Sequence, residues 1–353
     1  MTDAPHAADR VAPPSEAVRR QAADRLAGLA TPAGALGRLG EAAVWLAAVQ
    51  GHCPPSPPSD VRVVVFAGDH GVTAHGVSAY PPEITGLMVQ QFLSGGAGVA
   101  VLARLHGAAL RVLDLGVDVD AGTFPAEVSA YKVRRGSGAI HIEDALTGDE
   151  TLRALAAGAA VAAEEVAAGA DLLIAGDMGI GNTTPSAALI AATLGIGADE
   201  VTGRGSGIDV DALAHKQDVV DRALERAGAR VADPVDRLTA LGSADLAAQV
   251  GFLAEAARLG VPVVLDGVIS VACALVAEDY APGSSAWFAA GHRSPEPAQS
   301  LALEKLGLEP LLDLGMRLGE GSGAVAAIPV LRSAAAALAH VSLLADVLGA
   351  QDA

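Results

Sequence analysis

Short apolar runs alternate with longer amphipathic stretches over most of the chain. Five apolar runs each end at a glycine or a polar side chain: VRVVVFAGDHG, LRVLDLGVD, DLLIAGDMG, VPVVLDGV and SAWFAAGHRS. Between them, helical periodicity covers residues 82–105, 151–168, 211–227 and 243–259. Unbroken apolar strands that alternate with helices predict an α/β fold, a Rossmann-like parallel sheet with helices on both faces.

Both ends of the chain are expected to be helical. Helical periodicity covers residues 15–29 and 36–50 and is followed by the proline-rich linker CPPSPPSD, which suits neither a helix nor a central strand. We expect residues 1–14 to be disordered. Residues 15–59 and 311–353 are predicted to form a small helical domain, and residues 60–310 the parallel-sheet catalytic domain.

Composition narrows the class of protein. The 353 residues carry a net charge of −18, which argues against nucleic-acid binding because phosphate backbones need a basic surface. Cys53 and Cys273 have no spacing typical of zinc sites or disulfide frameworks, so we expect reduced thiols in a cytoplasmic protein. The polar start predicts no signal peptide, and Arg332, His340 and Asp346 interrupt the apolar stretch 323–349, so it predicts a buried helix and no membrane span.

The predicted strands end in polar side chains. In open parallel sheets, ligands bind beyond the carboxyl ends of the strands. The polar residues at these ends are therefore expected to share one rim: Asp69, His70, Asp114, Asp177, Asp266, His292 and Arg293.

The segment GDMGIGNTTP, residues 176–185, joins a predicted strand to a predicted helix. Thr184 suits the N-cap and Pro185 the first helical position, while Gly179 and Gly181 permit positive φ and a close approach of ligand to backbone. Consecutive amides at a helix start attract an anion, and a phosphate is the expected occupant. A tight turn that binds no ligand has the same local pattern. The segment matches neither a Walker A loop nor a dinucleotide fingerprint.

A second glycine-rich segment, LGMRLGEGSGA, places Glu320 between two glycines ahead of the last apolar stretch. A partly desolvated carboxylate there has a raised pKa and can act as a general base. The alternative is a solvated glutamate that caps a helix. Arg317 beside it offers a cation to an anionic substrate, and Met316 and Leu318 offer apolar walls.

Other polar residues permit more than one interpretation. His70 and His75, together with Asp69, suggest the hypothesis of a metal site. They lack helical spacing and a set of carboxylates to complete the site, so we predict no metal. Ser78, Tyr80 and Gln90 are typical of an aromatic-ligand pocket, although a surface turn explains Tyr80 equally. Lys216 is either an exposed helical lysine or a phosphate ligand.

Seven strings together resemble the nicotinate-nucleotide:dimethylbenzimidazole phosphoribosyltransferase family. They are PAGALGRLGEAAVWLA, VFAGDHGV, SAYPPEIT, GDMGIGNTTP, GRGSGID with AHK, AAGHRSPEPA and LGMRLGEGSGA. They occur in the family's order, and the resemblance covers residues 31 to about 349. It implies a Rossmann-like domain, a small helical domain made from both chain ends, and a homodimer.

The resemblance also implies a reaction and a site. The phosphoribosyl group of nicotinate mononucleotide moves to 5,6-dimethylbenzimidazole, with inversion and without a cofactor, giving α-ribazole 5′-phosphate and nicotinate. Glu320 corresponds to the general base. The resemblance assigns phosphate or nucleotide contacts to Asp177, Gly179, Ile180, Gly181, Asn182, Thr183, Lys216, Ser294 and Arg317. It assigns the benzimidazole pocket to Ser78, Tyr80, Gln90, Met178 and Leu318.

One departure and three alternatives remain at this point. Asp177 stands where many members of the family have Glu, so its contact to ribose or lysine is open. A related transferase could use adenine, another benzimidazole or a phenol as acceptor. A non-catalytic nucleotide sensor is disfavoured by Glu320. An NAD-dependent dehydrogenase is disfavoured because the dinucleotide fingerprint is missing.

Overall fold

Five parallel strands form the centre of the computed structural model, which describes residues 10–205 and 207–349. The strands are β1 (Val61–Gly68), β2 (Ala109–Gly116), β3 (Leu172–Met178), β4 (Val263–Leu265) and β5 (Phe288–Ala290). Each lies within one of the five apolar runs, except that β2 begins one residue earlier, and the order across the sheet is β2-β1-β3-β4-β5. The predicted parallel sheet is confirmed.

The strand order determines where a ligand can bind. The chain moves outward from β1 to β2 and then crosses back to β3, so the direction of winding reverses between β1 and β3. These two strands pair from Val61 opposite Leu172 to Ala67 opposite Met178. In open α/β sheets the crevice beyond such a switch point is the usual ligand site.

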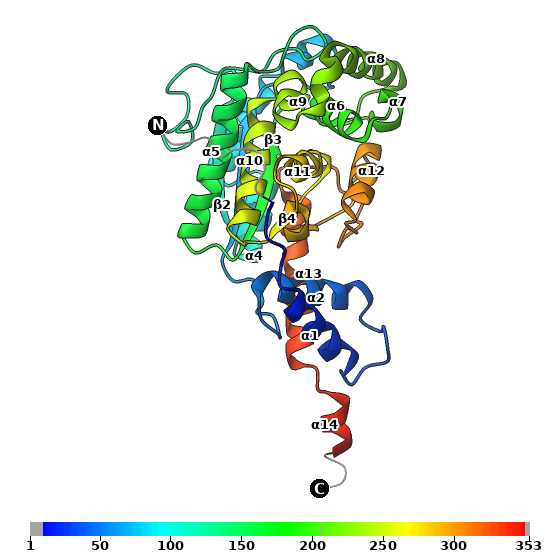
Figure 1. The fold of residues 1–353 in the computed structure, drawn as a ribbon. Coiled ribbons are helices and arrows are strands. Elements are labelled where there is room, and N and C mark those ends of the chain that lie inside the picture. The colour runs from blue at the N-terminus through cyan, green and yellow to red at the C-terminus, as the bar shows by residue number, and fades with distance from the viewer. Residues whose placement is uncertain (1–9, 206, 350–353) are drawn as a thin grey trace.

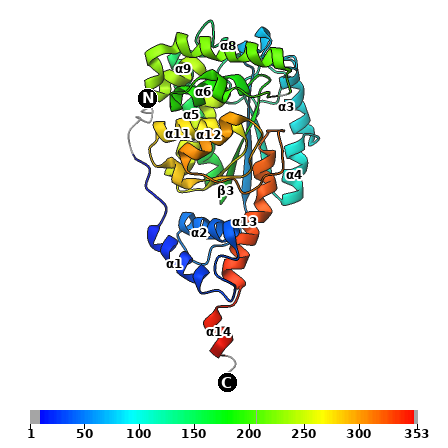
Figure 2. The same cartoon turned by 90° about the vertical axis from the view of Figure 1, so that its right-hand side faces the viewer.

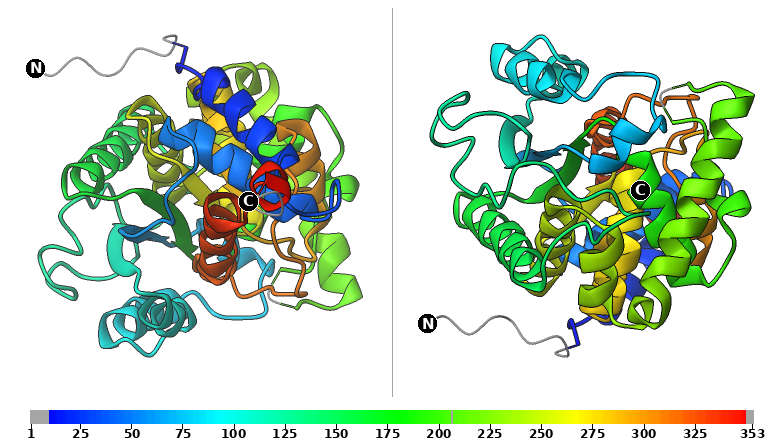
Figure 3. Two further views of the ribbon diagram at one scale, coloured as in Figure 1. Left: turned by 90° about the horizontal axis from the view of Figure 1, so that it is seen from below. Right: turned by 90° about the horizontal axis from the view of Figure 1, so that it is seen from above.

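Helices cover both faces of the sheet (Figures 1 and 3). Side chains alternate along β1, so Val64 and Phe66 pack into one apolar cluster and Val63 and Val65 into the other. The first cluster includes helices α5 (Gly148–Ala167), α6 (Thr183–Leu194), α10 (Ala244–Arg258) and α11 (Val268–Tyr280). The second includes α3 (Ile84–Ser94), α4 (Gly98–His106) and α13 (Ser322–His340). Burial on both faces explains why the strands are apolar throughout.

The remaining helices of the described residues complete the fold. The remaining α-helices are α1 (Glu16–Ala27), α2 (Gly37–Gln50), α7 (Ala198–Val201), α8 (Val210–Ala227), α9 (Pro234–Leu241), α12 (Pro297–Leu306) and α14 (Leu344–Gly349). Three 3₁₀ helices cover Gly71–His75, Gly228–Ala232 and Ser284–Trp287.

Two predicted helices are interrupted in the structure. The stretch 82–105 forms α3 and α4, because Gly95 ends α3 in the left-handed conformation with φ of 79°. The stretch 323–349 forms α13 and α14, which are separated by an extended Val341. A continuous hydrophobic pattern hid both breaks.

Helices α1 and α2 pack together with the end of α13 below the sheet (Figures 1 and 2). Arg25 of α1 donates hydrogen bonds to the carbonyl oxygens of Leu338 and Ala339. The apolar cluster on this face continues from β1 into α1 and α2. A division into two domains at residues 59/60 and 310/311 therefore stays a prediction.

The extended segment before α1 packs on the body of the protein. Residues 1–9 of the stretch expected to be disordered lie outside the described residues. In residues 10–14, the Val11 amide donates to the Pro282 carbonyl and Trp287 Nε1 donates to the Ala12 carbonyl. Val11 is buried. The expectation of disorder is therefore wrong for residues 10–14, because an apolar anchor and two hydrogen bonds hold them.

Two apolar segments, Ile84–His106 and Ser322–His340, are long enough to pass a length-and-hydropathy test for a membrane span. The first is divided at Gly95. The second is a core helix that buries Ile328 and Leu331 completely. Core helices pass the same test, so these segments are weak support for a membrane protein.

Candidate active site

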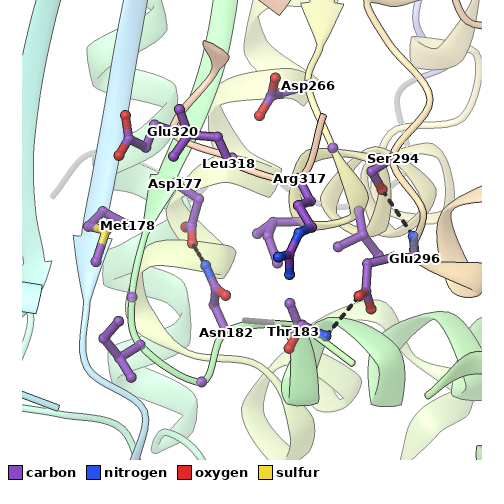
Figure 4. A pocket seen from close by; sticks show the side chains of 18 of the residues that line it. Asp177, Met178, Asn182, Thr183, Asp266, Ser294, Glu296, Arg317, Leu318 and Glu320 are labelled. Atoms are coloured by element: carbon purple, nitrogen blue, oxygen red, sulfur yellow. Dashed lines mark hydrogen bonds between the residues drawn. The ribbon is translucent and has the colours of Figure 1, made fainter. Parts of the chain in front are cut away.

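A cavity of about 670 Å³ opens beyond the carboxyl ends of β3, β4 and β5 (Figure 4). It brings together most of the residues that the sequence predicted for the site. These are Ser78, Tyr80, Asp177, Met178, Gly179, Ile180, Gly181, Asn182, Thr183, Ser294, Arg317, Leu318 and Glu320. Two predicted residues, Gln90 and Lys216, do not line it.

The segment between β3 and α6 forms one wall of the cavity. Gly181 adopts φ of 87°, whereas Gly179 lies so close to the Gly68 carbonyl and the His70 ring that a Cβ would overlap them. The Ile180 and Asn182 amides already donate to Thr85 Oγ1 and the Gly179 carbonyl. Within residues 10–205 and 207–349, the amides of Gly179, Gly181 and Thr183 have no hydrogen-bond acceptor. These amides are the donors left for an anion.

The start of α6 differs from the prediction. The helix begins at Thr183, and Asn182, already in helical conformation, precedes it without a side-chain cap. Thr184 therefore lies inside the first turn with its side chain buried, and Pro185 follows it. The helix therefore begins two residues earlier than the capping pattern suggested.

Lys216 lies behind this wall, buried in α8. Its Nζ donates to Thr183 Oγ1 at 2.7 Å and to the Gly203 carbonyl at 3.1 Å. Burial lowers the pKa of Lys216 to about 8, against a smaller opposing effect of the Glu296 charge. The ammonium therefore acts on the cavity through the Thr183 hydroxyl.

Asp177, the last residue but one of β3, turns toward the interior. Its two oxygens accept from Asn182 Nδ2 at 2.6 Å and Gln249 Nε2 at 2.7 Å. Burial, together with the Asp245 charge, raises the pKa of Asp177 well above its usual range. No recorded interaction among the described residues joins Asp177 to Lys216. The Asp177 carboxylate, one methylene shorter than a glutamate, thus holds Asn182 in place and does not contact Lys216.

Glu320 has the conformation most unusual for its residue type. Its φ is 66°, its carboxylate is buried, and Oε2 accepts from the Val99 amide in the first turn of α4 at 3.0 Å. Gly176 of β3 lies against its backbone, where a Cβ would overlap the Glu320 carbonyl. Burial raises the pKa of Glu320, the Val99 hydrogen bond opposes this, and the Asp266 charge adds to it. This direction suits a general base.

An apolar slot lies beside Glu320. The slot is lined by Met88 of α3, Met178, Ile180, Tyr80 and Leu318. Tyr80 and Leu318 are 53% and 55% exposed, so the slot is open to solvent on one side. Gln90 is exposed on α3 and lies outside the cavity lining. The slot can accept a flat apolar ring.

The opposite wall carries the remaining polar groups (Figure 4). Arg317 reaches into the cavity, and within the described residues no carboxylate pairs with it. The Ser294 amide donates to Gln299 Oε1 at 2.6 Å, and Glu296 Oε1 accepts from the Gly205 amide at 2.8 Å. Arg317 is thus available to an anionic ligand.

The histidines considered for a metal site have separate partners. His70 Nε2 lies 3.3 Å from Asp245 Oδ2, and the His75 ring packs edge-on against His141 at 4.5 Å. In the described part of the chain, no group of three or more His, Cys, Asp or Glu side chains could hold a metal ion.

Sequence reasoning gave no site role to several lining residues. Asp266 and His292 were expected on the rim, and Glu296 lies within the AAGHRSPEPA string. Their positions at the ends of β4 and β5 were the available signal. Met88 is one of many apolar residues in a helix and had no signal in the sequence.

Comparisons with known proteins identify the family of this chain. A family model described as "Phosphoribosyltransferase" matches residues 11–347. A protein of Mycolicibacterium paratuberculosis named nicotinate-nucleotide–dimethylbenzimidazole phosphoribosyltransferase is 54% identical over 95% of this chain and 96% of its own. A protein of the same name from Mycobacterium tuberculosis is 52% identical over 95% and 92%.

A solved structure extends the likeness to three dimensions. The crystal structure of CobT from Thermus thermophilus superposes with a TM-score of 0.89 at 44% identity, covering 94% of this chain and 98% of that one. The family model and the curated relatives each span nearly the whole chain. The resemblance seen in the seven strings is confirmed, and the chain belongs to the nicotinate-nucleotide–dimethylbenzimidazole phosphoribosyltransferase family.

Proposed function

We propose that this chain transfers the 5-phosphoribosyl group of nicotinate mononucleotide to 5,6-dimethylbenzimidazole, giving α-ribazole 5′-phosphate and nicotinate. The names of the relatives support this reaction. One observation carries the proposal: Glu320 and the start of α6 line the same cavity. The anion site is thereby available to the phosphate of the mononucleotide, and the base to the acceptor ring that attacks its ribose carbon.

The phosphate binds at the start of α6. The Gly181 and Thr183 amides are its donors, and the positive end of the helix dipole adds to them. The Thr183 hydroxyl accepts from Lys216 and can donate its own proton to a phosphate oxygen. Binding energy at this remote end positions the reacting ribose carbon.

The acceptor ring lies in the apolar slot with one nitrogen toward the ribose carbon. Glu320 removes the proton from the other ring nitrogen as the new C–N bond forms. The bond from the ribose carbon to the pyridinium nitrogen breaks, and its electron pair goes to nicotinate. The leaving group needs no acid because it departs from a cationic ring. Arg317 is available to the negatively charged nucleotide or to the nicotinate carboxylate.

The test of the base is Glu320→Gln. This variant keeps the shape of the side chain but cannot accept the proton. We expect nicotinate release from nicotinate mononucleotide and dimethylbenzimidazole to fall by about three orders of magnitude, within the range lost with a general base. Nucleotide affinity, measured by calorimetry, is expected to change little. A variant with comparable turnover would contradict the role of Glu320.

The acceptor is tested separately, because an apolar slot distinguishes flat rings poorly. The protein is incubated with nicotinate mononucleotide and one acceptor at a time: dimethylbenzimidazole, other benzimidazoles, adenine or a phenol. Products are identified by mass. We expect the highest kcat/KM with dimethylbenzimidazole, and a higher value for another acceptor would redirect the proposal to that ring.

We also propose that the protein is a homodimer through α3 and α4. These helices project at one side of the body (Figures 2 and 3), where Leu87, Leu93, Val101 and Leu105 are 45% to 72% exposed. An apolar face of this kind is typical of an interface, and a second copy is its proposed occupant. Light scattering should give a dimer for the wild type and a monomer for Leu105→Asp. A monomeric wild type would refute the assembly.

A cytoplasmic location is the last part of this proposal. Cys53 and Cys273 are both free, as is usual where thiols stay reduced. Cell fractionation of the tagged protein tests it, with activity in the cytoplasmic fraction as the expected result.

A further inference from the structure

Helix α13 begins without a capping side chain of its own. Its N-cap is Gly321, and the open amides of the first turn point instead at Asp266, which follows β4. Asp266 Oδ2 accepts from the Gly321 amide at 3.1 Å. Asp266 Oδ1 accepts from the Gly323 and Ala324 amides at 2.7 and 3.0 Å. A carboxylate from the sheet thus closes the start of a helix 55 residues later in the chain.

Asp266 is itself held in place. Its amide is hydrogen-bonded to Ser270 Oγ at 2.6 Å, and His292 Nε2 lies 3.5 Å from its Oδ1. The side chain is buried and lines the same cavity as Glu320. Each oxygen therefore has a fixed direction.

Glu320 immediately precedes the residues that Asp266 fixes. A left-handed conformation is unfavourable for a residue other than glycine, so the surrounding contacts must hold it. Val99 holds the carboxylate of Glu320, and Gly176 contacts its carbonyl. The bonds from Asp266 to the next amides fix the backbone on the other side.

We propose that Asp266 is a positioning residue for Glu320: by closing the start of α13 it keeps the Glu320 carboxylate directed into the cavity. This rests on the proposed role of Glu320 as the base. Asp266 needs no contact with substrate for this role.

The charge of Asp266 gives the proposal a second readout. Burial is the larger cause of the raised pKa of Glu320, and the negative charge of Asp266 raises it further, while the Val99 hydrogen bond lowers it. The charged or titratable side chains that line the cavity with Glu320 are Tyr80, Asp177, Asp266, His292, Glu296 and Arg317. Removal of the Asp266 charge is expected to move the acidic limb of the rate profile to lower pH.

The experiment compares Asp266→Asn with Asp233→Asn. Asparagine keeps the shape of Asp266 but offers a single oxygen and no charge. We expect kcat to fall at least about tenfold, since misplacement of a catalytic group is costly, with little change in KM for nicotinate mononucleotide. Asp233 also caps a helix, accepting from the Val235 and Asp236 amides at the start of α9. Asp233→Asn therefore removes the charge of a capping carboxylate outside the cavity, while its one oxygen can still accept both bonds, and should leave kcat and the acidic limb unchanged.

The outcomes separate this proposal from the proposed function. If Glu320→Gln is inactive but Asp266→Asn keeps the wild-type kcat and the wild-type acidic limb, the positioning role of Asp266 alone is overturned. An active Glu320→Gln would overturn the base itself. If Asp266→Asn does not fold, Ser270→Ala tests the proposal instead. It removes the hydrogen bond from the Asp266 amide to Ser270 Oγ and keeps the charge of Asp266. We expect a smaller loss of kcat with an unshifted limb, and an unchanged kcat would overturn the proposal.

Discussion

Lys216 offers the sharpest quantitative prediction, because its ammonium lies one hydrogen bond behind the proposed phosphate site. Nζ is 2.7 Å from Thr183 Oγ1. A phosphate oxygen that accepts from this hydroxyl would lie about 5 Å from Nζ. Two unit charges at that distance attract by about 3 kcal/mol at an effective dielectric constant of about 20. We therefore expect Lys216→Met to lower kcat/KM for nicotinate mononucleotide by up to about 100-fold.

The pH profile provides an independent check on this reasoning. The pKa of Lys216 is about 8, so the side chain is charged below that pH and neutral above it. Since kcat/KM reports the free enzyme, it should fall for the wild type as the pH rises through about 8. Lys216→Met should lack this basic limb and show the lower value at all pH values.

The assay is nicotinate release under subsaturating nucleotide, with Lys305→Met as the matched control. Lys305 is exposed in the last turn of α12 and does not line the cavity. Because burial penalises the charged form of Lys216, Lys216→Met should melt no lower than the wild type. An unchanged kcat/KM, or a basic limb that persists near pH 8 in Lys216→Met, would refute the argument.

Three further substitutions test the packing of the site. Asp177→Glu inserts a methylene into a buried position between Asn182 and Gln249. The free energy of unfolding should fall by about 1–3 kcal/mol, and Tm by a few degrees. An unchanged Tm would show that the site has room for the longer acid. Gly176→Ala pushes the Glu320 backbone away and should lower kcat more than nucleotide affinity; equal losses would argue against displacement of the base. Leu318→Ala removes one half-exposed wall of the ring slot. KM for dimethylbenzimidazole should therefore rise by about fivefold, while KM for the nucleotide stays the same. The opposite pattern would assign Leu318 to the nucleotide.

The sheet and most of the site were predictable from sequence because their signals are local. Five apolar runs mark the strands, and strand ends in a parallel sheet share one edge, which is enough to expect Asp177 and Asp266 near each other. The break at Gly95 was hidden because apolar periodicity continues across it. Helix ends depend on capping geometry, which the hydrophobic pattern does not contain.

Contacts between distant segments could not be predicted from one sequence. The Val99 amide meets Glu320 across 221 positions of the chain, and nothing near either residue signals this bond. The inward turn of Asp177 depends on Gln249, and the burial of Lys216 depends on how α8 packs behind Thr183. These details follow from the packing of helices on the sheet.

Helix α13 joins two distant parts of the molecule. Its 19 residues span about 28 Å, from the loop that carries Glu320 to the hydrogen bonds that Arg25 makes at Leu338 and Ala339. Loosening that far end would let the helix tilt, and a tilt of the helix would move the loop at its other end. Removing the first thirty residues, or fusing a bulky tag near α14, is therefore a perturbation of the chemistry and not merely of the periphery.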